Sequence, residues 1–135
     1  MISSERIMVC VHHGRNGERL IDRGSELAER LHCPLYVLNV TPEVSDRNPD
    51  EDMTHWQAAC GRTGGTLIVK AHGKHKPSEV IAEFARQHRI TQLIIGHPGL
   101  TRWQEIMQGS IVNELLHDLE EVDIHIVAVE RIMEE

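Results

Sequence analysis

The chain has 135 residues, of which 40% are hydrophobic and only 3% aromatic, and its formal net charge is -7. These values predict one globular domain over residues 1–135 with an aliphatic core. The acidic balance argues against a nucleic-acid partner or an anionic membrane surface, and no apolar run is long enough to span a bilayer. Three widely spaced cysteines, without a signal-peptide pattern, predict free thiols in a reducing cytoplasm.

Apolar runs and amphipathic stretches alternate along the chain. Short continuous apolar runs are typical of strands buried on both faces, and apolar residues at helical spacing indicate helices that cover a sheet. This alternation predicts an α/β fold, a doubly wound five-stranded parallel sheet with helices on both faces. The expected strands are 7–11, 35–40, 66–70, 93–95 and 124–129, and the expected helices are 20–31, 52–60, 77–88 and 111–119.

A glycine-rich stretch follows the fourth expected strand. The apolar run ends at Gly96, Gly99 comes next, and Gly109-Ser110 opens the last helical pattern. Glycines let the backbone approach a phosphate, and the free N–H groups of a helix N-terminus attract an anion. Ser110 can bond a phosphate oxygen or merely cap the helix. Two glycines alone indicate only a turn, but the full spacing between a strand and a helix favours nucleotide binding.

This spacing matches the nucleotide-binding signature of the universal stress protein family, which the chain resembles. The loop residues Arg102-Trp103 and the segments 18–21, 85–92 and 122–127 look like the universal-stress-type domain of potassium-sensor histidine kinases (KdpD type). The resemblance extends from about Arg6 to Val129. It implies the strand order 3-2-1-4-5 of adenine nucleotide alpha hydrolase-like folds and a regulatory role in stress or potassium-related signalling.

In that strand order, a ligand binds beyond the carboxyl ends of the first and fourth strands, where the order reverses. The resemblance implies that Val40, at the end of the second strand, lies against adenine. His12 stands where the family often has Asp, and Arg102 is a candidate phosphate partner. The full set of expected nucleotide-binding residues is Val11, His12, Val40, Gly96, Gly99, Arg102, Gly109, Ser110 and Ile111.

The expected ligand is ATP, with Mg²⁺ as a possible companion. Cyclic di-AMP ranks lower, because the Ser-x-Ser and Phe-Thr-Ala-x-Tyr patterns linked to it are replaced by 12–14 (HHG) and 35–39 (LYVLN). A domain that binds no nucleotide and only contacts a kinase or another copy of itself is the further alternative. No catalytic or metal-binding residues are expected, because the sequence shows no P-loop, no nucleophile motif and no histidine grouping with enough ligands. An ATP-hydrolysing enzyme is disfavoured because no general base is evident.

The resemblance also implies partners. A homodimer through the last strand, 124–129, is expected, as is a sensor histidine kinase, and the sequence leaves open whether the domain stands alone or is part of such a kinase. The apolar face of the last helix is expected to comprise Ile111, Val112, Leu115, Leu116 and Leu119.

Overall fold

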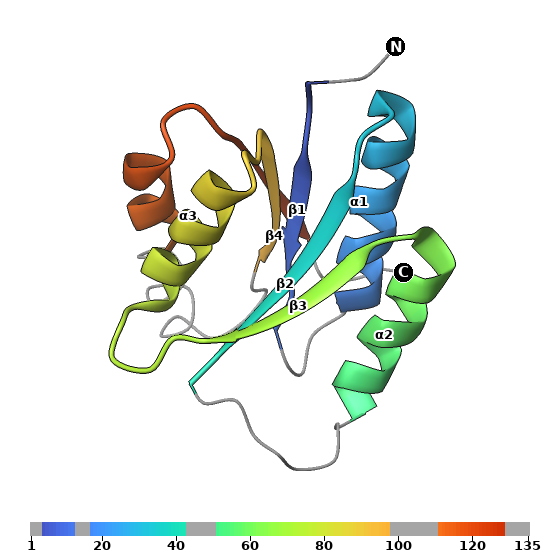
Figure 1. Cartoon of the computed structure of the whole chain (residues 1–135), viewed down its shortest axis with the longest axis horizontal. Helices are drawn as coiled ribbons and strands as arrows, with labels where there is room; N and C mark the ends of the chain where they lie inside the picture. Colours follow the sequence, from blue (N-terminus) through green and yellow to red (C-terminus); the bar gives the residue numbers. More distant parts are fainter. Residues whose placement is uncertain (1–3, 13–16, 43–50, 98–110, 129–135) are drawn as a thin grey trace, which may run out of the picture.

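A computed structural model describes residues 4–12, 17–42, 51–97 and 111–128. Strands and helices alternate along them, as the sequence predicts, and a helical segment over residues 111–118 precedes the last strand (Figure 1). The strands are β1 (Ile7–Cys10), β2 (Leu35–Thr41), β3 (Thr66–Ala71), β4 (Gln92–His97) and β5 (Asp123–Ala128), and the helices are α1 (Gly17–Leu31), α2 (Glu51–Thr63) and α3 (Pro77–Gln87).

The five strands form one parallel sheet in the order β3-β2-β1-β4-β5, which confirms the predicted fold. Helices α1 and α2 cover one face, and α3 and the segment 111–118 cover the other (Figure 1). Because every strand runs the same way, all carboxyl ends lie at one edge of the sheet. This edge is where a doubly wound fold places its ligand.

Strand β1 is the centre of two apolar layers. Its side chains alternate between the faces, so Ile7 and Val9 join the layer under α1 and α2, while Met8 and Cys10 join the layer under α3. All four are at most 2% exposed. A continuous apolar run is the sequence pattern that burial on both faces requires.

The face of the last helix differs from the prediction at Leu116. Leu115 and Leu119 are buried, but Leu116 is 55% exposed, so its assignment to the apolar face is wrong. Adjacent helical residues point about 100° apart, and in this helix the stripe that faces the sheet includes Leu115 and Leu119 but does not extend to Leu116. On β5, Ile126 is also 49% exposed.

Helix α1 lies unusually close to the sheet at Gly24. A Cβ atom at this position would lie 2.5 Å from Val9 Cγ2 and 3.0 Å from Leu35 Cδ1. Because Gly24 has no side chain, α1 can pack closely against β1 and β2. Gly61, in α2, is exposed, and a Cβ there would meet nothing within 4 Å.

These two helical glycines give a matched pair of substitutions. We expect Gly24→Ala to lower the free energy of unfolding by about 1–3 kcal/mol, because the added methyl overpacks the layer under α1. Gly61→Ala should raise it by about 0.5–1 kcal/mol, because alanine loses less backbone entropy in a helix. Urea denaturation of both variants measures the difference, and an equal effect at the two positions would contradict the close packing of α1.

Candidate functional site

The pairing between β1 and β4 ends before the carboxyl edge of the sheet, and this interruption is called the opening below. Among the described residues, β1 pairs with β4 only from Ile7–Val9 to Gln92–Ile94. Strand β4 nevertheless continues beside β5 up to the pair His97 and Ala128. The register of β1 with β4 therefore ends at Ile94, two residues before Gly96.

On the other side of the opening, the strands stay together. The backbone N–H of Val11 donates to Leu38 O at 2.9 Å, so β1 follows β2 rather than β4. Strands β2 and β3 pair up to Thr41 and Ala71, and His72 N donates to Thr41 O at 2.9 Å. Beyond the last β1–β4 pair, β1 is therefore attached to β2 and β3, and β4 is attached to β5.

The predicted residues that the structure describes lie at this edge. Val11 is fully buried, whereas His12, Val40 and Gly96 are partly exposed at the ends of β1, β2 and β4. Ile111 is partly buried against the α3-side layer, at the start of the segment 111–118. The remaining predicted residues lie outside the described residues, and they are Gly99, Arg102, Gly109 and Ser110.

The segment 111–118 is tied to the start of α3 by Glu114. The Ser78 hydroxyl donates to the Glu114 carboxylate, and Lys76 Nζ lies 3.5 Å from Glu114 Oε1. The Ser78 hydrogen bond, more than the nearby Lys76 charge, lowers the pKa of Glu114. Since α3 begins at the carboxyl edge, just after β3, this contact holds the segment 111–118 at the same edge.

Asn39 is a polar residue of this edge that sequence reasoning missed. Its side chain is 1% exposed, and its Nδ2 donates to the carbonyl oxygen of Val11 at 2.9 Å. The signal in the sequence was a single amide inside an otherwise apolar strand, LYVLNV. Its partner could not be known without the pairing of β1 with β2.

The amino edge of the sheet carries a separate polar cluster around Arg6. Arg6 Nε donates to His88 O at 2.6 Å, and the guanidinium also donates to the Tyr36 hydroxyl. The Arg6 N–H donates to Thr91 Oγ1 at 3.0 Å. These groups satisfy one another, so the cluster closes the amino edge and is no candidate for the ligand site.

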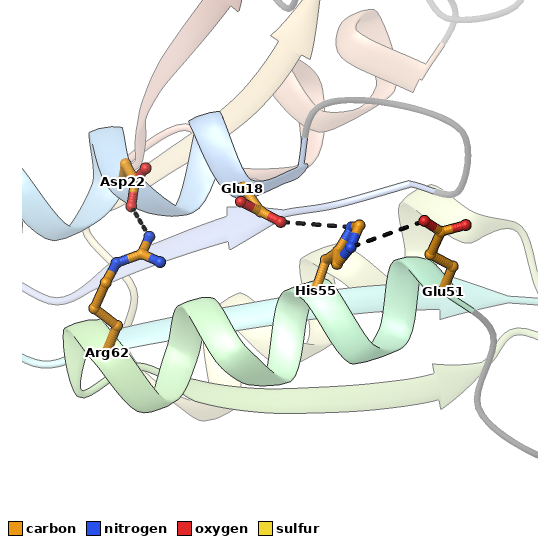
Figure 2. Close-up of polar contacts among 5 residues, drawn as sticks. All are labelled: Glu18, Asp22, Glu51, His55 and Arg62. Carbon is orange, nitrogen blue, oxygen red and sulfur yellow. Dashed lines mark hydrogen bonds and ion pairs between the residues drawn. The ribbon is translucent and has the colours of Figure 1, made fainter.

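A second polar cluster joins α1 and α2 along the surface (Figure 2). Arg62 Nη2 lies 2.5 Å from Asp22 Oδ1. The two ring nitrogens of His55 lie close to carboxylates, with Nδ1 3.5 Å from Glu18 Oε1 and Nε2 4.0 Å from Glu51 Oε1. All of these side chains are about half exposed or more, so each contact contributes little to stability. The cluster links α2 to α1 at the surface, and its exposed side chains do not enclose a binding site.

The described residues show no feature of metal, thiol or membrane chemistry. No group of three or more His, Cys, Asp or Glu side chains within them could hold a metal ion. The three cysteines are free, as predicted, and burial raises the pKa of Cys10 to about 12, so this thiol stays protonated at neutral pH. None of the helices in this part of the chain is long and apolar enough to cross a bilayer.

Comparison with known proteins agrees with this fold. Residues 3–121 match the model of the universal stress protein family, and the chain belongs to that family. Among curated relatives, a putative sensor protein KdpD of Synechocystis is 31% identical over 130 residues, which cover 92% of this chain and 34% of that protein. The sensor protein KdpD of Escherichia coli is 25% identical over 101 residues, which cover 73% of this chain and 11% of that protein. The chain thus spans about a third or less of these relatives.

Solved structures share the fold. A universal stress protein in complex with cAMP superposes with a TM-score of 0.68 at 16% identity, over 93% of this chain and 98% of the other. A universal stress protein from Archaeoglobus fulgidus in complex with dAMP gives a TM-score of 0.57 at 22% identity, over 96% and 100% of the two chains.

The Glu114 contact can be tested by its titration. The lowered pKa means that the contact stabilises the fold above the unfolded carboxyl pKa and is lost as the pH falls through the folded value. We expect an NMR pH titration to place the Glu114 midpoint below the ordinary 4.5, and Ser78→Ala to move it back toward that value. A midpoint that Ser78→Ala leaves in place would contradict the hydrogen bond.

Proposed function

We propose that this domain binds an adenine nucleotide, with ATP as the first candidate, and regulates a signalling process with little or no catalysis. The observation that carries the proposal is the separation of β1 from β4 at the carboxyl edge, where His12, Val40 and Gly96 remain partly exposed. Ligands of doubly wound sheets bind at this point. The cAMP and dAMP complexes of structural neighbours support adenine as the base.

Each described residue has a defined contribution. Val40 presents an aliphatic surface to the base, and the missing side chain of Gly96 lets backbone approach the ribose or phosphate. The N-terminus of the segment 111–118, with Ile111 in its first turn, favours negative charge. The sequence signature adds Gly99, Gly109 and Ser110 to this set, with Arg102 as a phosphate partner.

Mg²⁺ enters this site with the triphosphate. Mg²⁺ prefers oxygen ligands, and His12 offers an imidazole nitrogen at the position where a carboxylate is common in the family. We therefore expect the metal to be held by the phosphates and water, and the affinity for ATP to depend only modestly on Mg²⁺.

The signalling role is proposed from the KdpD relatives, which are named as sensor proteins. In this proposal the domain acts in the cytoplasm, and nucleotide occupancy controls its contact with a sensor histidine kinase in stress or potassium-related signalling. Two alternatives use the same surface, namely a cyclic di-AMP receptor and a domain that contacts its partner without a nucleotide.

Calorimetric titration with ATP, with and without Mg²⁺, and then with cyclic di-AMP tests the proposal. We expect saturable micromolar binding of ATP, lost in Gly109→Val because a β-branched side chain blocks the approach of a phosphate. Gly61→Ala is the control and should bind as the wild type does. Tight binding of cyclic di-AMP alone favours the receptor alternative. Silence with both ligands contradicts nucleotide binding and leaves protein contact as the function.

A homodimer through β5 completes the proposal. Among the described residues, strand β5 is at the end of the sheet and pairs only with β4, and Ile126 on it is 49% exposed, which favours addition of a second copy at this edge. We expect light scattering to show a dimer that Ile126→Lys converts to a monomer, whereas Glu83→Lys, on the exposed side of α3, leaves it dimeric. A monomeric wild type would contradict this part of the proposal.

A further inference from the structure

Asn39 occupies a place in the core that packing alone does not explain. It lies in β2 between Leu38 and Val40, and its side chain is 1% exposed. Its Nδ2 makes a hydrogen bond, but its Oδ1 is buried and has no hydrogen-bond partner within the described part of the chain. A buried polar atom without a partner lowers the stability of the fold. An aliphatic side chain of the same size would avoid this cost. The amide must therefore act through the bond that it does make.

The hydrogen bond of Asn39 holds Val11, the residue that directly follows β1. Val11 donates its N–H to Leu38 O at 2.9 Å, and its carbonyl accepts from Asn39 Nδ2, also at 2.9 Å. Both backbone polar groups of Val11 are thus attached to β2, two residues after the pairing of β1 with β4 has ended at Val9. His12 follows immediately.

The same strand carries the residue proposed to face the base. Asn39 and Val40 are adjacent, and side chains alternate between the faces of a strand. Val40 packs with the layer under α3, so Asn39 points to the opposite face, which Val11 shares. Asn39 and Val40 therefore connect the end of β1, through Val11, with the surface of β2 proposed to face the base.

We propose that Asn39 is a positioning residue of the nucleotide site, which fixes His12 relative to Val40 by holding the carbonyl of Val11. This proposal rests on the proposed nucleotide-binding function. It assigns Asn39 no contact with the ligand. It keeps the ends of β1 and β2 in one geometry in the nucleotide-free protein. Binding then costs less conformational entropy.

Two variants and two measurements test it. Asn39→Leu removes the amide at similar size, and Asn39→Asp keeps the shape but replaces the donor with an acceptor at neutral pH. In nucleotide-free protein, we expect both variants to speed exchange of the Val11 amide about tenfold relative to the Val37 amide, and both to weaken ATP binding about three- to tenfold. Asn39→Leu should keep the thermal stability of the wild type. Asn39→Asp should regain part of the Val11 protection at acidic pH, where the protonated carboxyl donates again.

Ser78→Ala is the control for exchange, because Ser78 is the other buried polar side chain of the described residues and belongs to α3, which covers the face of the sheet opposite the layer that contains Val11. It should leave Val11 exchange unchanged. Unchanged Val11 exchange in folded Asn39→Leu would overturn the proposal, as would faster exchange with unchanged ATP affinity. If the wild type binds no ATP, the proposed function fails by itself, and Val11 exchange still decides whether Asn39 holds the end of β1.

Discussion

The parallel pairing between β1 and β4 stops at Val9 and Ile94, and the rest of the molecule is arranged around that interruption. The two halves of the sheet are each continuous to the carboxyl edge, through β2 with β3 and through β4 with β5. The opening therefore lies between two paired sets of strands within one sheet. The carboxyl ends of β1, β2 and β4 lie at this edge, where a small ligand can reach backbone groups of both halves.

The opening depends on a core that fixes the strands from both sides. With only 3% aromatic residues, the two layers are filled mainly by aliphatic side chains, and β1 contributes to both. Close-packed aliphatic layers resist small shifts because each displaced atom loses contacts on several sides. Gly24 brings α1 down onto β1 and β2, and Glu114 attaches the last helix to α3. The site is thus positioned by the packed layers together with the Asn39 and Glu114 contacts.

The sequence predicted the elements well because buried parallel strands leave apolar runs and covering helices leave a periodic stripe. The lateral order of strands leaves no such pattern, and it came from the resemblance instead. Periodicity also placed Leu116 on the buried face, since it cannot show how wide a stripe the sheet covers. Asn39 was missed because its role depends on the register of Cys10 beside Leu38. Among the site residues, Gly99, Arg102, Gly109 and Ser110 stay predictions from the motif, because they lie outside the described residues.

The most direct test of this account is where a nucleotide perturbs the protein. In ¹H–¹⁵N NMR spectra recorded during ATP addition, we expect saturating shifts at His12, Val40, Gly96 and Ile111, which lie at the carboxyl edge. The amides of Arg6 and Thr91, at the amino edge, should remain in place. Shifts concentrated at the amino edge, or spread evenly over the sheet, would contradict a ligand site at the separation of β1 from β4.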